Sequence, residues 1–235
     1  MKYFIELTTN KKGVSFKMKT INIVFLFAIL VSGCMTSSYK YIEEPRGFYT
    51  LELEEVVRPE NVIEQFGNPT IINSKEKKKD NIFFENSYED NLIKIVWTVT
   101  NVQFNFILEN KSEHTVKIIW DDAVYIDITG TSQKVMHSGV KYTDRNNSQI
   151  PTVVIKNVKI EDLVSPTNNV YYRSGKYGGW TTSALFLRQA STKEILIKLT
   201  GMYFGKTVKV VLPLQVQDVV YNYSFIFKVV SFTID

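Results

Sequence analysis

Two histidines, one cysteine and a few clustered aspartates are the residues whose types could do chemistry in this chain of 235 residues. His114 and His137 lie far apart in the sequence, and neither has a nucleophile or an acid whose proximity follows from spacing. With a single cysteine, Cys34, the chain can form neither an internal disulfide nor a cysteine-cluster zinc site. The motifs G-x-S-x-G and H-E-x-x-H and a phosphate-binding glycine loop do not occur. The sequence therefore predicts a protein that is not an enzyme and needs no cofactor.

Asp144–Ser148 begins like a calcium-binding loop, with aspartate, asparagine and serine at alternate positions. An EF-hand loop also needs glycine at its sixth position and a bidentate glutamate at its twelfth. Gln149 and Ile155 stand there instead. The pair Asp121-Asp122 is typical of a turn, and Asp127 is predicted to point into solvent from a short strand. No metal site is expected.

Cys34 ends a segment with the layout of an export signal. Lys17 and Lys19 precede Ile21–Val31, an eleven-residue run with a single polar residue. Such a run is too short to cross a hydrocarbon core as a helix, which needs roughly 20 residues. A basic region followed by a short apolar region is typical of a secretory signal. Val31-Ser32-Gly33-Cys34 follows, and this sequence resembles the lipobox of bacterial lipoproteins.

The resemblance implies that a lipid such as palmitate is attached at Cys34 and that a signal peptide of residues 1–33 is removed. Translation from Met18 would leave a signal of ordinary length, so residues 1–17 are expected to have no structural role. The polar residues 34–47 are predicted to be a tether. Met35, where a retention signal would have aspartate, implies the outer membrane of the bacterial cell envelope. The alternative is a buried N-terminal helix with an incidental cysteine.

The net charge of +4 belongs to the leader and not to the body. Five of the 28 basic residues and one of the 24 acidic residues lie in residues 1–33, so the remaining chain is neutral. Because phosphate neutralisation needs clustered Lys and Arg, the neutral body argues against nucleic-acid binding. The body, especially Val96 to Val170, is also similar to uncharacterised lipoproteins of Bacteroidetes-like bacteria, a resemblance that implies no activity.

One stretch, Tyr171–Trp180, has the composition of a binding loop. It combines three glycines with four aromatic residues, one arginine and one lysine. Aromatic rings with polar tips beside basic groups suit stacking on sugars or holding a peptide. The other interpretation is a glycine-rich turn in which Tyr171 and Trp180 face the core. The candidate ligand-binding residues are Tyr172, Arg173, Tyr177 and Trp180.

The body is predicted to be all-β, an immunoglobulin-like β-sandwich with one short N-terminal helix, Pro59–Phe66. It spans residues 48–235, with residues 48–80 as a small N-terminal subregion. In Leu92–Glu109 the apolar residues change from odd to even positions, which predicts a bulge or bend near Thr100-Asn101. Trp97 and Trp120 are expected in the core.

Short alternating or apolar runs predict the other strands, and a charged run predicts a loop. A further strand is expected at residues 124–128, in which Val124, Ile126 and Ile128 face the core of the domain. The loop is Ser74–Asp80. The further strands are 48–54, 116–120, 153–155, 170–172, 185–187, 195–199, 207–212, stopped by Pro213, and 221–229.

These features favour a lipid-anchored envelope protein that acts as a binding or assembly module. Its expected partners are the membrane, through the N-terminal lipid, and an envelope glycan or protein. The alternative is an envelope hydrolase or glycan-processing enzyme on a β-sandwich framework. Two carboxylates, or one carboxylate and His137, converging on one cleft would favour that alternative. A purely structural role is the third interpretation.

Overall fold

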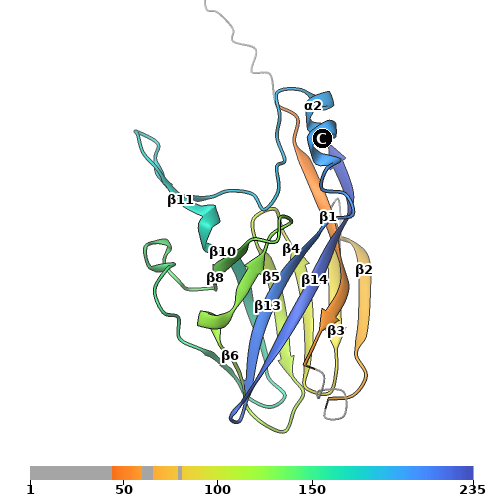
Figure 1. Ribbon diagram of the computed structural model, residues 1–235, viewed down its shortest axis with the longest axis vertical. Coiled ribbons are helices and arrows are strands. Elements are labelled where there is room, and N and C mark those ends of the chain that lie inside the picture. Colours follow the sequence, from red (N-terminus) through yellow and green to blue (C-terminus); the bar gives the residue numbers. More distant parts are fainter. Residues whose placement is uncertain (1–43, 60–65, 79–80, 235) are drawn as a thin grey trace, which may run out of the picture. The chain divides into compact units, whose positions relative to one another are not determined.

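The computed structural model describes residues 44–59, 66–78 and 81–234, which belong to the compact unit from Ile42 to Asp235. It is mostly β, as predicted, and its strands are all paired antiparallel (Figure 1). The strands are β1 (Gly47–Val57), β2 (Thr70–Lys78), β3 (Asn81–Glu89), β4 (Ile93–Val99), β5 (Phe104–Asn110), β6 (Val116–Ile118), β7 (Val124–Ile126), β8 (Ser132–Met136), β9 (Thr152–Val154), β10 (Lys159–Pro166), β11 (Val170–Arg173), β12 (Gly179–Thr182), β13 (Thr207–Val216) and β14 (Val219–Ile234). The helical elements that lie wholly within the described residues are α2 (Lys193–Thr200) and the 3-10 turns η1 (Trp120–Asp122), η2 (Tyr142–Asp144) and η3 (Thr167–Asn169).

Twelve of these strands form one continuous hydrogen-bonded sheet within the described residues. Its order is β1-β14-β13-β7-β8-β10-β5-β4-β3-β2, with β6 added beside β13 and β9 beside β6. Strand β10 joins the two halves, because its first six residues pair with β5 and its last two pair with β8. Strands β11 and β12 form a separate two-stranded hairpin.

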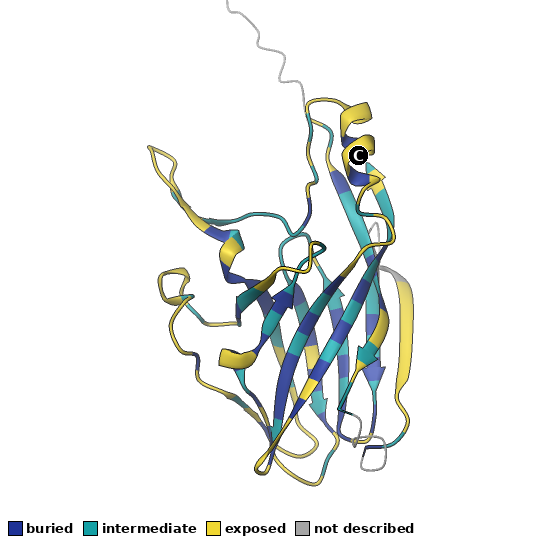
Figure 2. Ribbon diagram, in the orientation of Figure 1, coloured by how far each residue is buried: buried dark blue, intermediate teal, exposed yellow. Residues whose placement is uncertain are grey.

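The two halves of the sheet pack face to face through aromatic side chains. Trp97 of β4 lies 5.1 Å from Phe225 and 5.6 Å from Phe227 of β14, between ring centroids. Tyr88 of β3 meets Phe225 edge-on at 5.8 Å. Aromatic pairs of this geometry add about 0.5–1.5 kcal/mol beyond the area that they bury. In Figure 2 the buried positions accordingly alternate along β13 and β14.

Two asparagines connect β1 to the far end of the sheet. Asn86 of β3 accepts a hydrogen bond from the Leu53 amide at 3.0 Å and donates to the Leu51 carbonyl at 3.3 Å. Asn73 of β2, paired with Asn86, donates to the Leu53 carbonyl at 3.1 Å. Side-chain amides thus satisfy backbone groups of a strand edge that would otherwise be open.

The alternation in the last strand is confirmed, and the parity change in Leu92–Glu109 is explained. Tyr221, Tyr223, Phe225, Phe227 and Val229 are all buried in β14. The change of face near Thr100-Asn101 is a hairpin turn between β4 and β5, not the predicted bulge or bend. The Thr100 amide donates to the Gln103 carbonyl at 2.9 Å, and Val99 pairs with Phe104.

The prediction of a solvated loop at Ser74–Asp80 is wrong over Ser74–Lys78, which continues strand β2. Strand β2 pairs with β3 along its whole length and lies at the end of the sheet. An edge strand exposes one side to water, so charged residues are compatible with it and also discourage pairing with other chains.

The predicted strand Ile195–Leu199 is instead part of helix α2. The Thr192 hydroxyl accepts a hydrogen bond from the Ile195 amide at 3.3 Å, which caps the helix. Leu196 and Thr200, one turn apart, are its buried residues. The candidate strand Leu185–Leu187 is irregular chain in which Phe186 is buried.

Strand β13 does not stop at Pro213 but runs through it to Val216. Its neighbour changes there, from β7 beside Lys209–Val211 to β6 beside Leu214–Val216. The Pro213 carbonyl points to that side, since it accepts from the Ile119 amide at 3.0 Å. The missing amide hydrogen of proline therefore falls in the gap between β7 and β6, where no ladder bond is lost.

Trp97 and Trp120 are fully buried, as predicted, with Trp120 in the turn η1. The face of β7 is reversed, however. Tyr125 is buried against Phe104, with ring centroids 5.8 Å apart, whereas Val124 and Ile126 are half-buried. The larger aromatic ring takes the core position in this short strand.

Several predictions fall outside the described residues. These are the leader, Cys34 and most of the tether, and all of the helix Pro59–Phe66 except its ends. Phe66 itself is buried edge-on against Tyr221 at 5.1 Å. In the part of the chain that the structure describes, no helix has the length and hydropathy needed to cross a bilayer.

Candidate functional site

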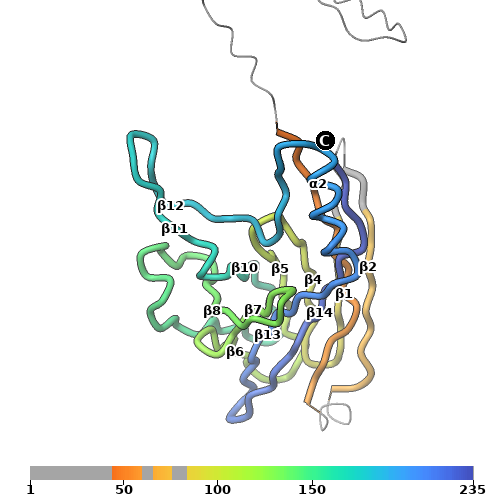
Figure 3. Tube along the Cα trace, turned by 45° about the horizontal axis from the view of Figure 1, so that its top comes forward, coloured from red at the N-terminus to blue at the C-terminus, as the bar shows by residue number. Residues whose placement is uncertain are grey.

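The segment Tyr171–Trp180 forms the β11–β12 hairpin, which projects from the body of the unit (Figures 1 and 3). Its base is anchored by Val170, which is buried, and by the Ser183 amide, which donates to the Asn169 carbonyl at 2.8 Å. Beyond that base the hairpin is mostly exposed (Figure 2). An isolated two-stranded hairpin contributes little stability, so its rings are available to a ligand rather than to a core.

Tyr172 and Trp180 pair across the hairpin and share one face. They are directly opposite each other in the register, and their rings meet edge-on with centroids 5.7 Å apart. Tyr172 is 62% exposed and Trp180 is 39% exposed. The alternative interpretation, in which Tyr171 and Trp180 face the core, does not hold because both side chains are exposed.

A second segment, the turn η2 and the residues after it, completes this face. The Tyr142 ring lies 6.3 Å from the Trp180 ring, and its hydroxyl accepts from the Thr182 hydroxyl at 3.4 Å. The Arg145 guanidinium lies 4.9 Å from the centroid of the Trp180 ring, within cation–π distance. Arg145 is held there by donating to the Tyr142 carbonyl at 2.8 Å.

We call Tyr142, Arg145, Tyr172 and Trp180 the aromatic face. It offers two partly exposed rings at an angle, a third ring beside them and one fixed positive charge. Rings of this kind bind the apolar faces of sugars or the side chains of a peptide, and a guanidinium pairs with carboxylate or phosphate. The arrangement therefore suits an acidic, partly apolar ligand.

The other two candidate residues lie elsewhere on the hairpin. Arg173 pairs with Gly179, one position along from Tyr172, so its side chain leaves the opposite face. Tyr177 is at the tip and is 89% exposed, with the Lys176 ammonium 5.5 Å from its ring centroid. The structure thus brings Tyr172 and Trp180 together and separates both from Arg173.

The tight tip depends on Gly178. A Cβ atom at this position would lie 2.2 Å from the Arg173 carbonyl oxygen, so no other residue fits without moving the backbone. The Gly178 amide donates to the Gly175 carbonyl at 2.9 Å and closes the turn. The predicted role of the glycines, presenting the aromatic residues on a tight turn, is consistent with this geometry.

Tyr142 and Arg145 were not identified from the sequence as parts of this site. Arg145 lies inside the calcium-like run Asp144–Ser148, and no pattern in the sequence distinguishes Tyr142. About thirty residues, which include strands β9 and β10, separate them from the hairpin. No rule based on sequence spacing therefore places them beside Trp180.

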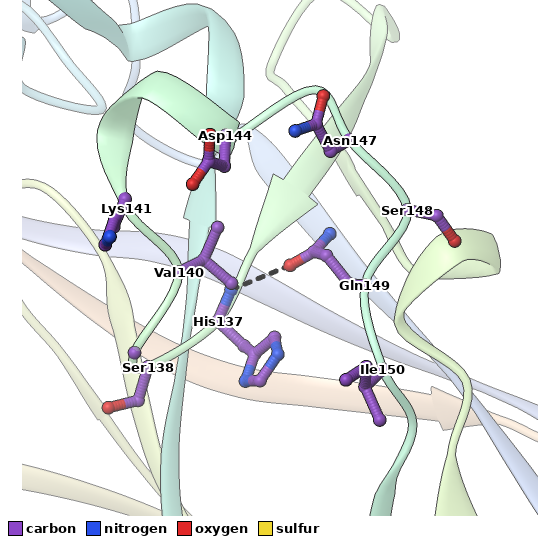
Figure 4. Close-up of a pocket in the computed structure, with 10 residues that line it drawn as sticks. His137, Ser138, Val140, Lys141, Asp144, Asn147, Ser148, Gln149 and Ile150 are labelled. Carbon is purple, nitrogen blue, oxygen red and sulfur yellow. Dashed lines mark hydrogen bonds between the residues drawn. The ribbon is translucent and has the colours of Figure 1, made fainter.

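A pocket of about 510 Å³ is lined by residues 137–141, 144 and 147–150, which flank the turn η2 (Figure 4). His137 and Ile150 line one side, and Lys141, Asp144 and Asn147 line the other. The Gln149 side chain accepts from the His137 amide at 3.3 Å and donates to the Val135 carbonyl at 2.7 Å. These bonds fix the backbone beneath the pocket.

His137 is held between an aromatic ring and a carboxylate. Its imidazole stacks on the Trp120 indole with centroids 4.5 Å apart and planes 4° from parallel. Its Nδ1 lies 3.4 Å from Asp162 Oδ2. Asp162 Oδ1 accepts from the Ser138 and Leu163 amides, each at 2.8 Å, which orients the carboxylate toward the imidazole. The imidazole and the carboxylate are therefore neighbours beside a pocket, but among the described residues Nδ1 makes no hydrogen bond.

Asp121 and Asp127 hydrogen-bond to polar groups of the chain: Asp121 holds a distant loop, and Asp127 closes its own turn. Asp121 binds the Ser148 hydroxyl and the Gln149 amide, and these hydrogen bonds lower the pKa of its carboxyl. Asp127 is half-buried rather than solvated. Burial raises the pKa of its carboxyl, but hydrogen bonds from Thr129 and Thr131 outweigh burial and lower it. Within the described ranges no three His, Cys, Asp or Glu side chains are grouped to hold a metal.

Comparison of this chain with protein-family models, with curated proteins and with solved structures gives no match.

Proposed function

We propose that this protein is a lipid-anchored binding module of the bacterial cell envelope, attached through Cys34 at the outer membrane and without catalytic activity. The ligand class is an envelope glycan that carries acidic groups. The observation that supports this function is the aromatic face, in which Arg145 lies over Trp180 beside Tyr172 and Tyr142 on an exposed hairpin. We propose an immunoglobulin-like sandwich as the class of the framework, since two halves of the sheet pack around one aromatic core.

Sugar binding fits these residues for a physical reason. A pyranose ring presents an apolar face that packs on an aromatic ring, and its hydroxyl groups remain free to hydrogen-bond at the edges. Arg145, fixed over Trp180, adds a donor for a carboxylate or phosphate of the glycan. A protein partner that presents acidic and aromatic side chains would use the same groups.

The test compares two neighbouring tyrosines on opposite faces of the hairpin. Tyr172→Ala removes one ring of the aromatic face, whereas Tyr171→Ala removes an exposed ring from the other face. Binding to purified acidic fragments of envelope polysaccharide is measured by isothermal titration calorimetry. We expect Tyr172→Ala to weaken binding about tenfold, which corresponds to ~1.4 kcal/mol, and Tyr171→Ala to bind like the wild type. Equal affinities of the two variants would contradict the assignment.

A second candidate function, an envelope hydrolase, is favoured by the His137–Asp162 pair beside the 510 Å³ pocket. In such an enzyme Asp162 would orient the imidazole, and His137 would act as the general base. The matched test is His137→Gln, which removes the base and keeps an amide of similar size. Loss of a hydrolytic activity on envelope polysaccharide in this variant, with unchanged melting temperature, would favour the enzyme over the binding module.

A further inference from the structure

Helix α2 and the turn after it expose large apolar side chains to solvent. Ile195 and Leu199, one turn apart in α2, form a stripe that Met202 continues in the turn after the helix, and Ile197 is exposed on another side of α2. Met202 and Phe204 are 68% and 67% exposed. The helix is held to the body by its other side, where Leu196 and Thr200 are buried. A clustered apolar surface of this kind is typical of a contact site.

This surface lies where the chain enters the β-sheet. The Gly47 amide at the start of β1 donates to the Arg188 carbonyl at 2.8 Å. Two residues later, the Tyr49 ring lies 5.8 Å from the ring of Tyr203, which stands between Met202 and Phe204. Figure 1 shows the start of β1 and α2 at the same end of the unit.

The distance along the chain from Gly47 to Cys34 is short. Thirteen residues span at most ~45 Å when extended, and about 20 Å as an average for a flexible chain. An acyl group on Cys34 would therefore keep α2 within reach of the bilayer surface. Tethering also raises the effective concentration of this surface at the bilayer to the millimolar range, so weak contacts are sufficient for it to bind the membrane.

The charges around α2 match an anionic lipid surface. Lys193, Lys198 and Lys206 are exposed, and Glu194 is the single acid between residues 193 and 206. Basic residues around an exposed apolar stripe are the features of helices that lie in the membrane interface.

We infer that α2 and residues 201–206 are a membrane-contact surface and that its occupant is the lipid bilayer to which Cys34 anchors the chain. This inference rests on the lipid anchor proposed above. Phe204 and Met202 enter the boundary between headgroups and acyl chains, and the three lysines lie at the headgroups. The contact holds the domain in one orientation on the membrane.

The test places a tryptophan at each end of the unit. Phe204→Trp reports from the proposed contact, and Val219→Trp reports from the exposed first residue of β14, beside the β13–β14 turn at the opposite end (Figure 1). The full lipidated protein is reconstituted into vesicles of phosphatidylethanolamine and phosphatidylglycerol that contain brominated lipid. We expect the emission added by Trp at position 204 to be mostly quenched and shifted to the blue. The emission added at position 219 should be unchanged.

Cosedimentation with the vesicles measures the anchor separately from the contact. If the protein cosediments but the two positions are quenched equally, the membrane-contact surface is wrong and the anchor stands. If the protein does not cosediment, both proposals fail. Met202→Trp provides a second position in the same surface and should behave like Phe204→Trp.

Discussion

The hydroxyl of Tyr223 in β14 donates a hydrogen bond of 2.9 Å to the carboxylate of Asp90, 133 residues earlier in the chain. Tyr88 donates to the same oxygen at 2.6 Å, and the Arg58 guanidinium lies 3.1 Å from it. The other carboxylate oxygen accepts from the Leu92 and Ile93 amides, each at 2.9 Å. The buried carboxylate of Asp90 therefore has hydrogen-bond partners on both oxygens. It connects β3, β14 and Arg58, which follows β1.

This network predicts a loss of stability at alkaline pH. Burial and then the charge of Asp90 raise the pKa of Tyr223 far above its ordinary value of 10.0, and burial raises that of Tyr88. Above pH ~10 the unfolded chain releases protons that the native protein retains, so stability falls with pH by about 1.4 kcal/mol per pH unit for each tyrosine. Tyr223→Phe should reduce this slope by the contribution of one tyrosine, about 1.4 kcal/mol per pH unit. Urea unfolding between pH 9 and pH 11.5 measures the slope. The same dependence of stability on pH in the wild type and in Tyr223→Phe would contradict this contribution of Tyr223.

The asparagine connection between β1 and β3 gives a second prediction. Asn86→Ala removes the donor to the buried Leu51 carbonyl and the nearer acceptor of the Leu53 amide, which keeps only its longer bond of 3.3 Å to Asn73 Oδ1. We expect a cost of ~1–3 kcal/mol in the free energy of unfolding, measured by denaturant titration, and faster amide exchange at Leu53. Asn73→Ala is the matched control. Asn73 is exposed, so water can replace its bonds and the loss should be smaller.

The hairpin tip should be independent of the core. Substituting Arg173 and Tyr177 together by Ala removes two exposed side chains, so the melting temperature followed by circular dichroism should move by no more than a few degrees. Gly178→Ala, in contrast, places a Cβ against the Arg173 carbonyl and should disorder the hairpin. A clear destabilisation by the double substitution, with an unchanged set of partners in a pull-down from envelope extract, would exclude a recognition role for the tip.

The lipid anchor is tested at its attachment residue. Cys34→Ala removes the only thiol, so the chain should accumulate as an unprocessed precursor that incorporates no labelled palmitate. Deleting residues 2–17, so that translation starts at Met18, should leave processing intact. Acylation and cleavage of the alanine variant would show that the lipobox interpretation is wrong.

Local patterns in the sequence determined much of this protein by themselves. The period of two in residues 221–229 identified a half-buried strand, because adjacent side chains of a strand leave opposite faces. The change of parity near Thr100-Asn101 located a break in the strand pattern, although it predicted a bulge or bend where the chain makes a hairpin. The apolar faces of their strands placed Trp97 and Trp120 in the core. An amphipathic pattern indicates which face of an element is buried, and it depends only on residues that are close in the sequence.

Tertiary structure decided the features that depend on neighbours distant in sequence. Whether Pro213 ends a strand depends on what lies beside it, and here the gap between β7 and β6 removes the cost of its missing amide. Ile195–Leu199 is helical because Thr192 caps it and Leu196 has a place to be buried. The aromatic face forms because the chain folds Arg145 back over Trp180. Such contacts join residues that no local pattern relates, so only the assembled sheet brings them together.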